Sequence, residues 1–305
     1  MRHPMSAPHL WTVAEAARAV QARQISAAEL LEAVLARAQL VQPKLNAFLR
    51  IDAELARVQA RSADQELAHG RVRGPLHGVP MAHKDMYYRA GVPSSCGSRI
   101  KGEQPEQVTA TALERLDAAG AIQFAVLNMA EFAYGPTGHN HHYGHCRNPW
   151  HPDHITGGSS SGSASAVGAR ATFAALGSDT GASIRLPAAL CGVTGLKVTY
   201  GRISRAGAMP LSFSMDTVGP LARSAEDCAL LLGVMAGHDP ADATSSHEAV
   251  PDYRAQLARP VRGLRIGVAL NYFTDDVDAG VGAALTDSIR TLESLGCSSE
   301  ERRGG

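Results

Sequence analysis

The sequence predicts an α/β fold in which a mixed, largely parallel β-sheet forms the core and helices cover both faces. Apolar segments of strand length alternate with longer segments of helical periodicity along most of the 305 residues. Apolar residues make up 45% of the chain, enough for a sizeable core. We assign residues 1–296 to one domain and residues 297–305 to a tail that lacks the preceding pattern.

The first third of the chain has the pattern of helices. Residues 12–15 and 26–29 fit the capping box, in which a hydroxyl and a glutamate satisfy the free N–H groups of a starting helix. An apolar stripe with helical spacing follows over 30–38. Residues 52–69, rich in alanine, arginine and glutamine, predict a third helix.

Strands and helices are predicted to alternate further along the chain. In order, we expect a strand at 78–84, a helix at 108–119, a strand at 122–127, a helix at 164–176, a strand at 264–270 and a helix at 277–295. A helix that ends at a glycine such as Gly296 normally leads into another strand in this fold class. We therefore expect a C-terminally truncated or altered end.

Composition argues against several classes of protein. The 29 basic and 29 acidic residues balance, so no basic footprint for nucleic acid is expected. No apolar run reaches the length of a membrane span, and the N-terminus lacks the apolar core of a signal peptide. Five widely spaced cysteines without a CxxC pair predict a reduced, cytoplasmic protein.

The serine- and glycine-rich segment at 155–189 has three interpretations. A flexible linker would not run into the apolar residues at 164–176. A phosphate-binding loop is possible in principle, but the Walker pattern and GxGxxG are both absent. The third interpretation is catalysis by a serine, whose hydroxyl needs a base. The segment contains no histidine, so the base could be a lysine, as in Ser–Lys variants of the triad.

Several separated motifs resemble the amidase signature family in order and spacing, over roughly residues 10–296. The matching stretches are Leu76–Pro80 with Lys84–Asp85, Asn148–Trp150, Gly157–Ser163, Gly177–Ala188, Gly195–Arg202, and Asp216 with Gly219–Pro220 and Glu226–Asp227.

The resemblance implies a Ser–Ser–Lys triad. Ser183 would be the nucleophile, Lys84 the general base, and Ser159, on a cis peptide bond, the bridge between them. The backbone N–H groups of Thr180, Gly181, Ala182 and Ser183 would form the oxyanion hole. Ser160, Asp179 and Arg185 would support the loop, the last two as a structural pair.

The lysine role has a physical requirement. A free lysine has a pKa of about 10.4 and is charged at neutral pH, so a basic Lys84 needs its pKa lowered to about 7.5 by burial. A buried strand around Val79 and Met81 can provide this. The family often has glycine at the position of Ala182, and we expect that this backbone does not need a positive φ and that alanine is accommodated without strain.

Two other groups of residues are candidates for sites. The run at 139–146 holds four histidines and a cysteine, but its spacing is too tight for a tetrahedral zinc site, so surface or pocket-lining histidines are the better interpretation. Cys191, between apolar neighbours, is expected to pack in the interior.

The leading hypothesis is an amidase that converts a carboxylic amide to an acid plus ammonia or an amine, with no metal, nucleotide or organic cofactor. Its partner would be a small-molecule amide, with a homo-oligomer possible and neither nucleic acid nor membrane involved. One alternative is the glutamine-hydrolysing A-subunit of an aminoacyl-tRNA amidotransferase, which needs partner subunits; the family's glutamine-binding Arg/Asp pair would lie beyond this sequence. The histidine-rich loop at 135–146 favours the stand-alone amidase. The other alternative is an inactive, truncated fragment.

Overall fold

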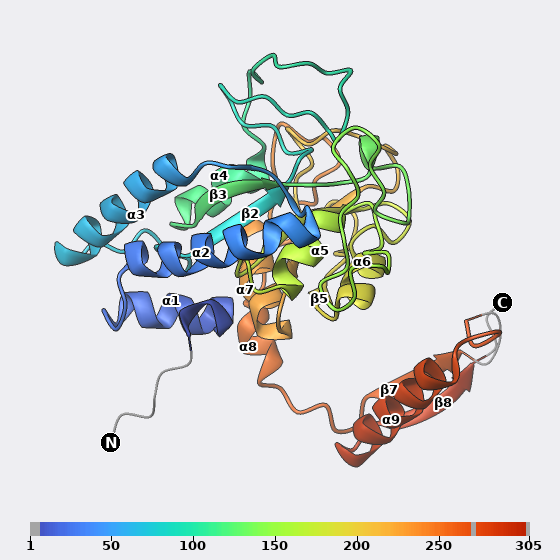
Figure 1. Cartoon of the computed structure of the whole chain (residues 1–305). Coiled ribbons are helices and arrows are strands. Elements are labelled where there is room, and N and C mark those ends of the chain that lie inside the picture. Colours follow the sequence, from blue (N-terminus) through green and yellow to red (C-terminus); the bar gives the residue numbers. More distant parts are fainter. Residues whose placement is uncertain (1–6, 270–272, 303–305) are drawn as a thin grey trace. The chain divides into compact units, whose positions relative to one another are not determined.

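The N-terminal segment is helical, as predicted. In this computed structural model, which describes residues 7–269 and 273–302, a short 3-10 turn η1 (Pro8–Leu10) precedes α1 (Val13–Gln21). Both capping boxes are formed, one at α1 and one at α2 (Ala27–Leu45). α3 (Ala53–Ala68) follows and packs against α2 (Figure 1). The apolar sides of these helices belong to the main core.

A mixed six-stranded sheet forms the centre of the larger unit and confirms the predicted α/β class. Its strands are β1 (Phe48–Ile51), β2 (Pro80–Lys84), β3 (Ile122–Leu127), β4 (Ala175–Asp179), β5 (Thr194–Gly195) and β6 (Thr217–Ala222), in the order β1-β3-β2-β4-β6-β5. The central strands β3, β2 and β4 are parallel, and antiparallel strands flank them on both sides. Helices α2, α3, α5 (Ser161–Gly168) and α7 (Ala225–Met235) pack against this sheet.

The register of the parallel strands places their carboxyl ends together. His83 of β2 pairs with Leu176 of β4, so Lys84 and Ser178 lie near the same edge of the sheet. Ligand sites of open α/β sheets occur at this edge, outside the carboxyl ends of the strands. The fold therefore brings the lysine strand and the start of the nucleophile loop into one region.

The predicted helix at 164–176 is partly wrong. The helix begins earlier and ends at Gly168, and residues 175–176 already belong to β4. Short runs of small apolar residues look alike in a buried helix and a buried strand, so periodicity could not separate them. The remaining helical elements of the larger unit are α4 (Thr111–Ala118), η2 (Glu131–Ala133) and α6 (Arg185–Cys191).

The chain divides into two compact units, residues 1–254 and 255–305, with α8 (Tyr253–Leu257) spanning the boundary. The second unit holds β7 (Arg265–Ala269), α9 (Ala279–Ser294) and β8 (Ser298–Arg302), and β8 pairs with β7 in parallel. The sequence pattern did not predict β8, because its residues, SSEER, show no apolar alternation. Leu270 of the predicted strand and residues 303–305 lie outside the described residues.

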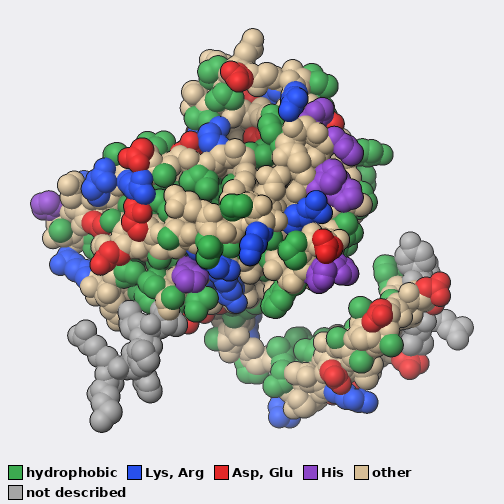
Figure 2. Space-filling model, viewed as in Figure 1, with side chains coloured by type: hydrophobic (Ala, Val, Ile, Leu, Met, Phe, Trp, Pro, Cys, Tyr) green, Lys and Arg blue, Asp and Glu red, His purple; other side chains and the backbone are tan. Residues whose placement is uncertain are grey.

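The surface carries charges of both signs. Figure 2 shows acidic and basic side chains interspersed over the visible face of the larger unit, with several of the histidines along its right side. No helix within residues 7–269 and 273–302 combines the length and hydrophobicity needed to cross a bilayer.

Candidate active site

Lys84 lies at the end of β2 with none of its surface exposed. Its Nζ donates hydrogen bonds to Ser159 Oγ at 2.7 Å and to Ser178 Oγ at 2.9 Å. Both serines are buried as well. A buried amine with two hydroxyl neighbours is an arrangement in which a proton can pass between lysine and serine.

Burial lowers the pKa of Lys84 to about 7. The carboxylates of Asp179 and Asp216 act in the opposite direction, because negative charge nearby favours the ammonium form. A large fraction of Lys84 is therefore neutral near pH 7. This meets the requirement for a general base at this position.

Ser159 and Ser160 lie at the start of α5. The peptide bond between Gly158 and Ser159 is cis, as the resemblance implies. A Cβ at Gly158 would lie 2.5 Å from the Gly135 carbonyl oxygen, so the backbone packs tightly there. The Ser160 N–H donates to the Ser183 carbonyl oxygen at 3.2 Å, which joins the two serine-bearing loops.

The buried Asp179 carboxylate organises the loop that carries Ser183. It accepts hydrogen bonds from the N–H groups of Ala182, Ile184 and Arg185 at 2.8, 3.1 and 3.2 Å. The Arg185 guanidinium donates two more at 3.0 Å. Burial alone would raise the pKa of Asp179, but Arg185 and the loop N–H groups lower it below its ordinary value. The carboxylate therefore stays charged and holds the loop.

Ala182 departs from expectation in two ways. Its φ is +98°, in the region that favours glycine, so the expectation of an unstrained alanine is wrong. Its N–H is already donated to Asp179, which removes it from the predicted oxyanion donors in this conformation. Within the described part of the chain, the N–H groups of Thr180, Gly181 and Ser183 form no hydrogen bond and stay available.

Ser183 is less buried than Lys84 and Ser159. Its side chain is half-buried, and its hydroxyl forms no hydrogen bond with another described residue. The structure thus joins Lys84 to Ser159 directly but does not join Ser159 to Ser183 by a hydrogen bond. In unliganded enzymes such contacts often form only when substrate binds.

Sequence reasoning assigned no role to Ser178 and Asp216. Ser178 is the second partner of Lys84. The buried Asp216 accepts hydrogen bonds from Thr180 Oγ1 and from the N–H groups of Leu211 and Ser212. Two signals in the sequence could have pointed to these residues. Ser178 is a polar residue on a buried strand, and Asp216 directly precedes another buried strand.

The histidine run forms a ring cluster. His139 stacks on His145 with ring centroids 4.3 Å apart, and His141 meets His145 edge-on at 5.3 Å. His142 pairs with Glu131 at 2.7 Å. Across residues 7–269 and 273–302, no group of three or more His, Cys, Asp or Glu side chains has the geometry of a metal site. Cys191 is buried, as predicted, and burial raises the pKa of its thiol.

A family model and individual known proteins were compared with this chain, and they point to the same family. The family model described as "Amidase" matches residues 29–303. The A-subunit of the glutamyl-tRNA(Gln) amidotransferase of Pseudomonas aeruginosa is 48% identical over 288 residues, covering 94% of this chain and 59% of the relative.

Two solved structures share the fold closely. One, described as a vestigial protein complex that reveals the origins of an s-triazine catabolic enzyme, has a TM-score of 0.91 and 39% identity over 95% of this chain and 64% of its own. The peptide amidase of Stenotrophomonas maltophilia has a TM-score of 0.89 and 36% identity over 96% of this chain and 62% of its own. The chain spans about three fifths of the length of these proteins.

Proposed function

Because the chain belongs to the amidase family, we propose that it hydrolyses a carboxylic amide by acyl transfer to Ser183. The observation that carries this proposal is the buried Lys84, with a pKa near 7 and a hydrogen bond to Ser159. Neutral Lys84 takes the proton of Ser159, and Ser159 takes that of Ser183 as Ser183 attacks the amide carbonyl carbon. The C–O bond that forms gives a tetrahedral intermediate.

The loop N–H groups complete the mechanism. Those of Thr180, Gly181 and Ser183 stabilise the oxyanion, and removal of one such donor typically costs about 3–4 kcal/mol of transition-state stabilisation. The C–N bond then breaks, and the amine leaves with the proton returned through Ser159. Water attacks the acyl ester, with Lys84 again the base, and releases the acid and free Ser183.

Asp179 and Arg185 support the loop in this scheme, and neither is needed for proton transfer. Their mutual hydrogen bonds, together with the three loop N–H groups on Asp179, fix the backbone around Ser183. Ser160 contributes by its N–H contact to the Ser183 carbonyl.

Two amide substrates fit this chemistry. The similarity over 94% of the chain to a glutamyl-tRNA(Gln) amidotransferase supports glutamine, with the ammonia passed to partner subunits of a tRNA-dependent amidotransferase. The 36% identity to a peptide amidase over 96% of the chain supports a second candidate, a stand-alone amidase acting on another amide. Glutamine hydrolysis measured with and without amidotransferase partner subunits separates them, because only the amidotransferase component depends on its partners.

Intact-mass labelling with a fluorophosphonate tests the shared chemistry. We expect one adduct on the native chain, none on Ser183→Ala and slow labelling of Lys84→Ala. Ser165→Ala is the matched control, because Ser165 is a buried serine of α5 whose hydroxyl donates to the Arg147 carbonyl, away from Lys84. An adduct that persists in Ser183→Ala, or a folded native chain that stays unlabelled, would contradict the proposal.

A further inference from the structure

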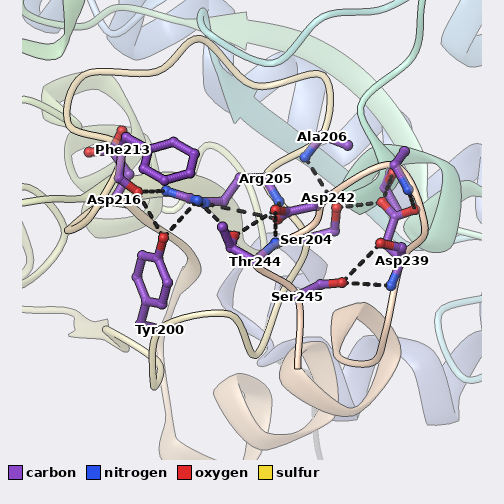
Figure 3. Close-up of polar contacts among 12 residues, drawn as sticks. Tyr200, Ser204, Arg205, Ala206, Phe213, Asp216, Asp239, Asp242, Thr244 and Ser245 are labelled. Carbon is purple, nitrogen blue, oxygen red and sulfur yellow. Dashed lines mark hydrogen bonds and ion pairs between the residues drawn. The ribbon is translucent and has the colours of Figure 1, made fainter. Parts of the chain in front are cut away.

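The nucleophile loop is held from one side by Asp216, which accepts a hydrogen bond from the Thr180 hydroxyl. The segment that leads to Asp216 is fastened by Arg205, whose Nη1 donates to the Phe213 carbonyl at 2.6 Å (Figure 3). Ser159 lies on a different segment of the chain. It needs a separate support, because proton transfer along a relay requires aligned groups.

Residues 128–138 lie along the turn that carries Ser159. The Ala130 N–H donates to the Ser159 carbonyl oxygen at 3.1 Å. A Cβ added at Gly158 would lie 2.5 Å from the Gly135 carbonyl oxygen. The two backbones are in contact, so a shift of residues 128–138 would be transmitted to Ser159.

The Glu131 side chain connects this segment to two others. Its Oε1 accepts hydrogen bonds from the buried Ser98 hydroxyl at 2.6 Å and from His142 Nε2 at 2.7 Å. We propose that Glu131 is a positioning residue that fixes residues 128–138 and thereby holds Ser159 in line for proton transfer. The inference rests on the proposed amide hydrolysis and deepens it, because Glu131 acts through Ser159 and not on the substrate.

The Glu131 carboxylate is ionised at neutral pH. The Ser98 hydroxyl and, to a smaller extent, His142 lower the pKa of Glu131 below its ordinary value, because both donors favour the charged form. An ionised carboxylate accepts hydrogen bonds and cannot donate them, so His142 Nε2 is the donor. Both bonds end on the same oxygen, Oε1. A glutamine at this position can therefore keep both bonds through its amide oxygen.

The buried Asn140 and the backbone add further ties to the same segment. Asn140 Nδ2 donates to the carbonyl oxygens of Met129 and Gly97, each at 2.8 Å. The Phe132 N–H donates to the Cys96 carbonyl oxygen at 2.9 Å. The residues before and after Glu131 are thus both fastened, and the histidine-rich run takes part through Asn140 and His142.

The backbone after Glu131 is strained. The φ angle is +49° at Phe132 and +58° at Ala133, in the left-handed region that residues other than glycine rarely adopt. Such conformations persist only where the surrounding structure enforces them, and they cluster at functional sites. The ties through Glu131 and Asn140 supply this enforcement. Loss of the Glu131 carboxylate should therefore let the segment relax away from Ser159.

Fluorophosphonate labelling of glutamate variants tests the proposal. Glu131→Ala should lower the labelling rate at saturating probe about tenfold or more, because small misplacements of relay groups have large effects on rate. The half-saturating probe concentration should change less than about twofold, and the acid limb should stay near pH 7, because Glu131 is not among the charges acting on Lys84. Glu131→Gln should label within about twofold of the native rate. Glu32→Ala, which removes an exposed glutamate of α2 paired with Arg57, is the matched control and should change neither value.

A double-mutant cycle separates positioning through Ser159 from a general effect on folding. In a chain that already carries Ser159→Ala, Glu131→Ala should reduce the residual labelling rate by less than about twofold, because the residue that it positions is gone. A loss of about tenfold in both backgrounds would overturn the proposal, since independent effects add. An equal loss in Glu131→Gln and Glu131→Ala would overturn it as well.

Hydrogen exchange tests the structural step without any labelling. In Glu131→Ala the Ala130 amide should exchange at least about tenfold faster, because its bond to the Ser159 carbonyl opens, while the amides of α1 should be unchanged. A folded native chain that is never labelled would contradict the proposed hydrolysis and leave this measurement valid. An Ala130 amide that keeps its native protection in Glu131→Ala would overturn the inference.

Discussion

Replacing Ser178 with alanine isolates the second hydrogen bond of Lys84. The Ser178 hydroxyl accepts a hydrogen bond from Lys84 Nζ at 2.9 Å, and both side chains are buried. A hydrogen bond to a charged group contributes about 1.5–3 kcal/mol, and one to a neutral group about 0.5–1.5 kcal/mol. The loss therefore destabilises the ammonium form of Lys84 by about 1–1.5 kcal/mol more than the neutral amine.

That difference sets the direction of the pH effect. One pH unit corresponds to about 1.36 kcal/mol, so the pKa of Lys84 should fall from about 7 by about one unit. The reaction needs neutral Lys84, so the rate rises as pH increases through this pKa, and the acid limb should move to lower pH. On the plateau the rate should fall about fivefold, because an orienting bond of about 1 kcal/mol to the neutral amine is lost.

The rate of fluorophosphonate labelling between pH 5 and pH 9 measures both effects without a known amide substrate. Ser178→Thr keeps the hydroxyl and serves as the control, with its acid limb near that of the native chain. An acid limb that stays near pH 7 or moves upward in Ser178→Ala would refute the reasoning.

The remaining predictions concern the surrounding backbone and charges. Asp216→Asn should also move the acid limb of labelling to lower pH, because the Asp216 carboxylate raises the pKa of Lys84. The control is Asp242→Asn, at a buried carboxylate that is not among the charges acting on Lys84, and it should leave the acid limb unchanged. Equal shifts in the two variants would argue against an effect of Asp216 on the pKa of Lys84. Ala182→Gly should increase the free energy of unfolding in urea by about 0.5–1 kcal/mol, because it relieves an alanine at φ +98°; a clear decrease would mean that the strain is absent. Gly158→Ala should lower the free energy of unfolding by about 1–3 kcal/mol or more, because the added Cβ would lie 2.5 Å from a backbone oxygen. Gly233→Ala in α7, where an added Cβ meets open space, is the control and should not destabilise the chain.

Local signals in the sequence predicted much of the fold. The capping boxes at Thr12 and Ser26 depend on residues three positions apart, and the structure forms both. The strand ending at Lys84 and the strand at 122–127 were also predicted within a few residues. The boundary between α5 and β4 was not, because alanine-rich segments suit both a buried helix and a buried strand.

The sequence indicated some features of the candidate site, and others became visible only in the structure. The resemblance to the amidase signature family singled out Lys84, Ser159 and Ser183, and the glycines of its motifs fit the tight backbone around Gly158. Only the packed structure showed that Ser178 is a partner of Lys84, because parallel pairing of β2 and β4 brings together residues 94 positions apart. The φ of Ala182 and the use of its N–H by Asp179 were likewise set by the loop's hydrogen bonds.

The sequence by itself determined the fold class, because helix caps and apolar periodicity are properties of neighbouring residues. The side chains of the candidate site were indicated by the resemblance of its motifs to the amidase signature family. The tertiary structure alone decided the pKa of Lys84, the donors left for an oxyanion and the contacts between residues 128–138 and the turn at Ser159. Each of these depends on burial and on contacts between distant segments, which no local pattern encodes.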